Sequence, residues 1–147
     1  MATLLLAADR AALIRRLRQL QPTTQPRWGT LTAPKMVCHL GDSLRIGLGE
    51  LPAKREDTLP RRTLLKWLVV YSPVPPPPGK IQTAPEMLTT VPATWAQDVA
   101  TLEALIERLG TTPTAAVHPF FGPLSHGGWG RLSWKHVDHH LRQFGCT

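Results

Sequence analysis

The chain lacks the features that would place it in a membrane or outside the cell. Its apolar stretch at residues 4–8 stops at Asp9 and Arg10, so it is too short to cross a bilayer. That stretch also lacks the basic start and full apolar region of a secretion signal. There are only two cysteines, Cys38 and Cys146, and their spacing fits neither a zinc ribbon nor a disulfide framework. We therefore expect a cytoplasmic protein with no membrane partner.

Acidic residues are scarce as well, with 10 Asp and Glu against 17 Lys and Arg and a formal net charge of +7. Such an excess can indicate a nucleic-acid partner. The basic residues are dispersed over three segments, however, and the chain has no RNA-binding aromatic signature, basic arm or zinc finger. Solvated helix faces explain this charge better, so nucleic acid is not an expected partner.

Neither strand-like alternation nor an internal repeat is found, whereas helical spacing of apolar residues is frequent. The 147 residues, 42% of them hydrophobic, suit a single domain spanning residues 1–147. Thr32 and Thr94 are predicted N-caps, and Gly110 is a predicted helix terminator. The fold class is thus predicted to be all-α, a four-helix bundle with long connecting loops. The helices are expected at about residues 9–19, 32–48, 94–109 and 126–144.

Two segments between these helices have a distinct composition. Residues 64–70 form a short, strongly apolar segment, which is predicted to be helical or extended. The proline run at 73–78 cannot be helical and is interpreted as a stiff polyproline spacer along the surface. A proline-recognition module is the alternative interpretation of that run.

Three of the six histidines lie within five positions near the C-terminus. In a helix, His136 and His140 would be about one turn apart on one face, in a sector of about 60° shared with Trp129 and Gln143. Lys135 is predicted to lie outside this sector. On the second helix, His39 shares a face with residues that should also point inward: Met36, Ser43 and Ile46.

Burying several imidazoles is costly unless each finds a partner. A shared metal ion is one solution, and histidines bonded to backbone carbonyls or to Asp42 are another. A His136 and His139 pair is also geometrically possible. The zincin protease motif is excluded, because Val137 stands where that motif needs a glutamate.

The remaining candidate ligands are given ordinary roles. His118 and His126 fall in a loop and are expected to have loop or capping roles. Cys38 and Cys146 are expected to be unligated thiols. A second apolar arc on the last helix should pack on a neighbouring helix, within the chain or across a dimer; it consists of Trp134, Val137 and Leu141.

Several motifs together resemble a bacterial branch of the DinB-like superfamily, a branch that is itself a domain of unknown function. The most specific of them is the run from His136 to Gly145. At the start of the last helix, His126-Gly127-Gly128 departs from the acidic, helix-favouring residues expected there, which weakens the predicted first turn. The motifs lie at residues 27–29, 36–40, 79–87, 118–122, 129–132 and 136–145.

The resemblance implies a DinB/YfiT-type four-helix bundle, often a homodimer, with a metal site built by one histidine of the second helix and two of the fourth. By position these are His39, His136 and His140. It implies a divalent transition metal, zinc or nickel first and iron as a further choice. It also implies a thiol S-transferase acting with a low-molecular-weight thiol such as bacillithiol or mycothiol.

The expected function is therefore that of a metal-dependent transferase or hydrolase acting on small molecules, with its catalytic residues unassigned. Asp42, Gln143 and His139 are candidates for a second shell that would orient the ligand imidazoles. The alternative is a non-catalytic metal-binding or stress-related helical bundle.

Overall fold

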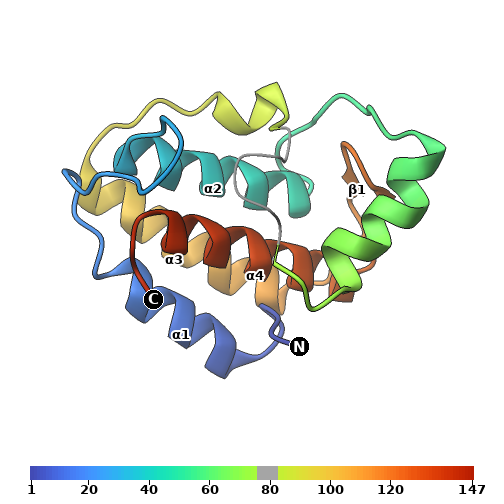
Figure 1. The fold of residues 1–147 in the computed structure, drawn as a ribbon, viewed down its shortest axis with the longest axis horizontal. Coiled ribbons are helices and arrows are strands. Elements are labelled where there is room, and N and C mark those ends of the chain that lie inside the picture. Colours follow the sequence, from blue (N-terminus) through green and yellow to red (C-terminus); the bar gives the residue numbers. More distant parts are fainter. Residues whose placement is uncertain (76–82) are drawn as a thin grey trace.

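Four α-helices form the body of the computed structural model, which describes residues 1–75 and 83–147 (Figure 1). Helices α1 and α2 each pack against both α3 and α4, so the four helices enclose a common core. The prediction of a mainly helical fold is confirmed for the described part of the chain. The helices are α1 (Ala7–Leu17), α2 (Ala33–Gly47), α3 (Trp95–Thr111) and α4 (His126–Gln143).

Side-chain caps begin the two helices that carry most of the histidines. Thr32 accepts a hydrogen bond from the Lys35 backbone N–H at the start of α2, as predicted. Ser125 accepts one from the Gly128 backbone N–H, at 3.1 Å, at the start of α4. This cap compensates for the two glycines of the first turn, so α4 begins at His126.

The prediction that Gly110 ends its helix is wrong, because α3 continues to Thr111. Gly110 is buried against the N-terminal segment. A Cβ atom at this position would lie 2.2 Å from the Leu4 carbonyl oxygen and 2.6 Å from Cδ of Arg10. The glycine is therefore required for the close approach of two chain segments and not for helix termination.

Shorter elements connect the helices. The segment after α2 is helical in two π-type turns, and its second turn packs on α4 (Figure 1). A 3₁₀ turn packs on α2, and a small antiparallel hairpin that the all-α prediction lacked lies between α3 and α4 in the chain. These elements are η1 (Arg61–Leu65), η2 (Trp67–Tyr71), η3 (Pro85–Leu88), β1 (Val117–His118) and β2 (Gly122–Pro123).

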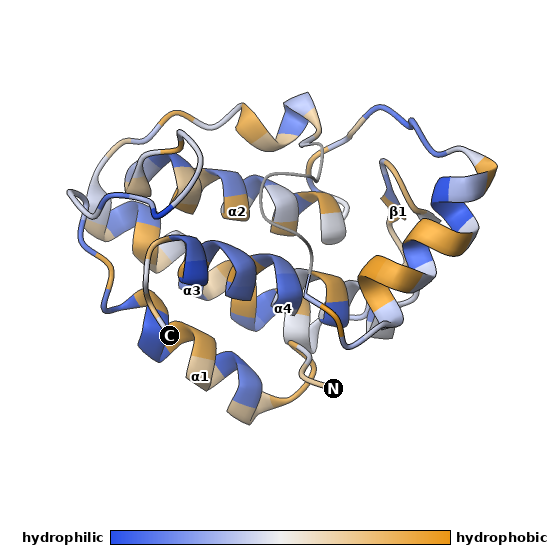
Figure 2. Ribbon diagram, viewed as in Figure 1, coloured by the Kyte–Doolittle hydropathy of each residue, from blue (hydrophilic) through white to orange (hydrophobic). Residues whose placement is uncertain are grey.

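The apolar segment at 64–70 is helical, and it is only partly buried. Leu64 and Trp67 are 73% and 61% exposed, whereas Val70 is fully buried. Figure 2 shows that apolar residues make up much of this helical segment. No described helix combines the length and the hydropathy needed to cross a membrane. The proline run enters the stretch 76–82, so its interpretation as a polyproline spacer lies outside the described residues, as do residues 79–82 of the 79–87 motif.

The second apolar arc of α4 packs inside the same chain. Val137 and Leu141 belong to the core and are 1% and 0% exposed, and Trp134 is half-buried against that core. The arc therefore packs on neighbouring helices of its own chain, which is the first of the two predicted arrangements.

Candidate metal centre

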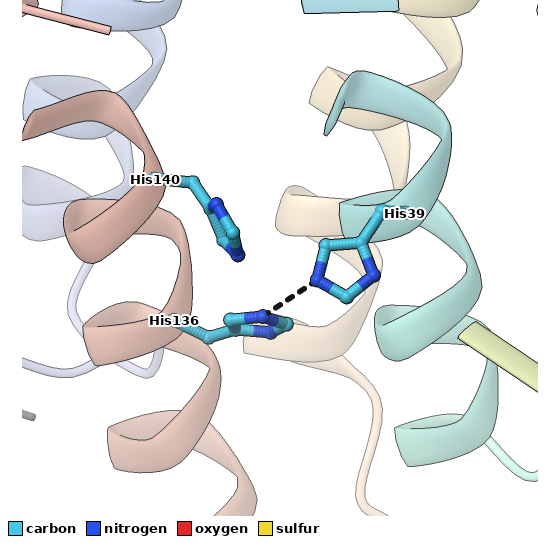
Figure 3. Close-up of side chains that lie close together, drawn as sticks. All are labelled: His39, His136 and His140. Carbon is cyan, nitrogen blue, oxygen red and sulfur yellow. Dashed lines mark hydrogen bonds between the residues drawn. The ribbon is translucent and has the colours of Figure 1, made fainter. Parts of the chain in front are cut away.

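Packing of α2 against α4 brings together the three histidines selected from the sequence. His39 of α2 faces His136 and His140 of α4 (Figure 3). One ring nitrogen of each lies within 4.8 Å of the corresponding atoms of the other two. His39 and His140 are buried, and His136 is half-buried. Three imidazole nitrogens therefore converge on one point between two helices.

The hydrogen bond of His39 to the main chain fixes which of its nitrogens is free. Its Nδ1 lies 3.0 Å from the carbonyl oxygen of Met87 in η3. A carbonyl can only accept, so Nδ1 carries the proton and Nε2 keeps its lone pair. That Nε2 lies 3.0 Å from Nε2 of His136. The free nitrogen of His39 thus points into the cluster.

A two-step chain of hydrogen bonds fixes His140 in the same way. The Gln143 amide Nε2 donates to the Trp28 carbonyl oxygen at 2.7 Å, so its Oε1 faces His140. This oxygen lies 2.7 Å from Nδ1 of His140 and can only accept, which again places the proton on Nδ1. Nε2 of His140 therefore keeps its lone pair. The predicted orienting role of Gln143 agrees with this contact.

His136 is the residue whose tautomer can change. Its Nε2 donates to His39 Nε2, since that atom has been shown to be an acceptor, and its Nδ1 then accepts from the Ser43 hydroxyl at 3.1 Å. A serine hydroxyl can donate or accept. If Nε2 of His136 gave its lone pair to a metal ion, the proton could sit on Nδ1. The Nδ1–H group would then donate a hydrogen bond to the Ser43 oxygen.

The surroundings keep all three imidazoles neutral at pH 7. Burial lowers the pKa of His39, and burial together with the nearby His39 lowers the pKa of His140 to about 3. Burial first, and then the imidazoles of His39 and His140, hold the pKa of His136 well below its ordinary value. Neutral imidazole is the form that binds metal ions.

The cluster opens onto a cavity of about 300 Å³. Most of its described wall is apolar or aromatic, and no described lining residue is an aspartate or a glutamate. A small molecule that enters the cavity would meet the three histidine nitrogens at one wall. The apolar part of the wall is formed mainly by Trp28, Leu31, Met87, Phe120, Phe121 and Leu132.

Asp42 does not take the predicted place beside a histidine. It is 1% exposed, and it accepts hydrogen bonds from the Thr90 backbone N–H at 3.0 Å and from the Thr90 hydroxyl at 2.5 Å. Within residues 1–75 and 83–147 it makes no hydrogen bond to a histidine. Asp42 instead holds the segment that follows η3, the turn whose Met87 carbonyl orients His39.

His139 borders the cluster without joining it. Its ring makes edge contacts with Trp28, at a centroid distance of 5.8 Å, and with His140, at 5.2 Å. It is half-buried and lines the cavity. The alternative pair of His136 with His139 is not the one that meets His39.

Lys135 was predicted to lie outside the inward sector of α4, and this is wrong. It is 7% exposed and lines the cavity wall. Its ammonium donates to the carbonyl oxygens of Val69 at 2.8 Å, Ser72 and Val74. The helical wheel of α4 could not reveal this role, because the acceptors belong to the end of η2.

His126 and the two cysteines have the positions of structural residues. His126 bonds to the Leu109 carbonyl oxygen through Nε2 at 2.9 Å. His118 is buried in β1 and, unlike His126, lines the cavity. Cys38 and Cys146 are buried free thiols outside the histidine cluster.

These observations define a mainly helical protein with three convergent imidazoles beside an apolar cavity. A family model described as "Protein of unknown function (DUF1569)" matches residues 4–147, so the chain belongs to that family. The assignment to the DinB-like superfamily is thereby corrected, since DUF1569 is a distinct family. Comparison with curated proteins and with solved structures gives no match.

Replacing Gln143 with leucine is expected to weaken Zn²⁺ binding by about 10- to 100-fold, the usual cost of losing an outer partner of a ligand histidine. Leucine is apolar, so it can neither accept from His140 Nδ1 nor donate to the Trp28 carbonyl oxygen. Competition with a chromophoric chelator measures the affinity. A Gln143→Glu variant keeps an acceptor for His140 and should lose less affinity, so equal losses in both variants would refute the orienting role.

Proposed function

We propose that the chain binds one divalent transition metal ion through Nε2 of His39, His136 and His140. The observation that carries this proposal is the pair of outer hydrogen bonds that leave lone pairs on His39 and His140 directed at a common point. An all-imidazole set suits zinc and nickel best, with iron as a further candidate. We also propose that α1–α4 form a four-helix bundle, since α1 and α2 each contact both α3 and α4.

The spacing of the nitrogens supports this assignment. Tetrahedral zinc with Zn–N bonds of 2.0–2.1 Å needs nitrogens about 3.3 Å apart. His39 and His136 are 3.0 Å apart and all three nitrogens lie within 4.8 Å, so small side-chain rotations suffice. Three protein ligands leave a coordination position for a small molecule, and this is the arrangement of catalytic rather than structural zinc sites.

The chemistry that these residues favour is thiol transfer to a small, largely apolar molecule. A divalent metal lowers the pKa of a water molecule or a thiol at its open position. No described residue of the cavity wall is a carboxylate that could act as a general base for hydrolysis. A thiol needs less help than water, because its own pKa of about 8.5 lies closer to neutrality. A low-molecular-weight thiol is therefore the proposed co-substrate.

The test combines metal analysis with a turnover assay. The protein is purified after expression with added zinc or nickel, and elemental analysis is expected to find about one ion per chain. The loaded protein is then given cysteine or glutathione with 1-chloro-2,4-dinitrobenzene, and formation of the S-dinitrophenyl thioether, with chloride as the leaving group, is followed against a metal-stripped sample. Metal-dependent thioether formation supports the proposal.

Two other results would contradict parts of it. A bound ion without thiol turnover would favour the alternative of a non-catalytic metal-binding protein. Absence of any bound ion would remove the metal centre itself. The homodimer and the cytoplasmic location stay predictions.

A further inference from the structure

His118 is a buried histidine that the proposed metal centre does not use. It lies in β1, is 5% exposed and lines the same cavity as the histidine cluster. Its Nδ1 accepts hydrogen bonds from the backbone N–H groups of Phe120, at 3.1 Å, and Phe121, at 3.2 Å. A backbone N–H can only donate, so Nδ1 is unprotonated and the neutral ring carries its proton on Nε2. Burial, which lowers the pKa of His118 to about 3, agrees with a neutral ring at pH 7.

The ring is held rigidly in this orientation. It stacks on Phe121 with a centroid distance of 4.6 Å and an interplanar angle of 17°, and Trp129 lies 5.3 Å away on centroids. Trp129 is itself fixed by a hydrogen bond from its Nε1 to the Ala116 carbonyl oxygen, at 2.8 Å. The stacking and the two hydrogen bonds to Nδ1 fix the ring, so Nε2 cannot rotate to reach a protein acceptor.

The Nε2–H group of His118 has no hydrogen-bond partner in the described part of the chain. Two polar side-chain atoms in that part of the chain are fully enclosed and have no partner, Ser133 Oγ and Trp134 Nε1. The Nε2 atom of His118 is not enclosed in this way. Because the side chain borders the cavity, the group is open to that space. A fixed donor beside an apolar wall gains free energy when a ligand supplies an acceptor.

We propose that His118 is a substrate-binding residue whose Nε2–H donates to the carbonyl oxygen of an apolar carbonyl compound held in the cavity. This inference rests on the proposed function in one respect, that the cavity is the substrate site. The Lys135 ammonium offers no free N–H group to a ligand, because it already donates to three main-chain carbonyls. The apolar body of the compound would contact the aromatic wall, including Phe120 and Phe121.

The test compares acetophenone with ethylbenzene, which has almost the same shape and no carbonyl oxygen. Binding to the metal-free protein is measured by ¹H–¹⁵N NMR titration, so the result does not depend on whether any metal binds. In His118→Asn the side-chain oxygen can replace Nδ1 as acceptor for Phe120 and Phe121, and no donor remains at the Nε2 position. We expect this variant to bind acetophenone about 3- to 10-fold more weakly, the worth of one neutral hydrogen bond, and ethylbenzene unchanged.

Equal weakening for both compounds, or no weakening for either, would overturn the proposal. If His118→Asn fails to fold, imidazole ¹⁵N spectra of the wild type decide the matter. They must show His118 protonated on Nε2, with that proton shifting on addition of acetophenone and not of ethylbenzene. If the protein binds no metal ion but the His118 proton still shifts with acetophenone, the metal centre is refuted and the role of His118 is not.

Discussion

Replacing His136 with alanine is expected to lower the affinity for Zn²⁺ by more than about 100-fold, beyond the effect of losing an outer partner. His136 is one corner of a nearly equilateral triangle of rings, with centroids 4.8 Å from His39 and 4.9 Å from His140, and His39 and His140 are also 4.9 Å apart. Without it, two imidazoles from different helices remain, and two further positions of a tetrahedral ion would have to be filled by water. Chelator competition gives the affinity, and elemental analysis gives the metal content after purification.

A matched control is available on the same helix. His126→Ala removes a histidine at the first position of α4, whose Nε2 bonds to the Leu109 carbonyl oxygen and which is not a member of the cluster. Its Zn²⁺ affinity should equal that of the wild type. Wild-type affinity in His136→Ala, or an equal loss in both variants, would exclude the proposed ligand set.

The metal-free protein is expected to lose at least about 4 kcal/mol of unfolding free energy when the pH falls from 7.5 to 5.0. His118 and His140 both have folded-state pKa values of about 3, against 6.5 in the unfolded chain. The unfolded chain therefore takes up protons below pH 6.5 while the folded chain does not, so stability is present above pH 6.5 and declines toward pH 3. At pH 5.0 this amounts to about 2 kcal/mol per histidine.

Urea denaturation in the presence of EDTA at the two pH values measures this loss. A pH of 5.0 lies above the ordinary pKa values of the carboxyl groups, so histidines dominate the change. His140→Gln removes one of these imidazoles and should make the loss smaller by about 2 kcal/mol. Unfolding free energies that are equal at both pH values would show that these rings are not held neutral by the fold.

The histidine cluster could be predicted because helical periodicity alone decides which faces of two helices point inward. His136 and His140 are one turn apart, and His39 shares its face with Ser43, so all three were expected to point inward. Their combination into one ligand set was implied by the family resemblance. Gln143 followed from the same wheel. These predictions depend on local geometry, which a sequence records directly.

The errors share a different physical origin, in that each depends on a contact between distant segments. Gly110 looks like a terminator until the N-terminal segment is packed against it. Lys135 looks exposed until the carbonyls at the end of η2 are placed beside it. The carboxylate of Asp42 is taken by Thr90, 48 residues away, and the tautomer of His118 depends on a hairpin that has no periodic signal.

The Ser43 hydroxyl can either donate to Nδ1 of His136 or accept from it, and this affects how many protons are released when a metal ion binds. Thiolate sites release protons when they are loaded, which couples their affinity to the surrounding buffer. Here every ligand is already neutral at pH 7, and the single proton that must leave Nε2 of His136 can be retained by the same ring on Nδ1. Loading the site would therefore exchange one hydrogen bond for a coordination bond, with no net proton released by the three imidazoles.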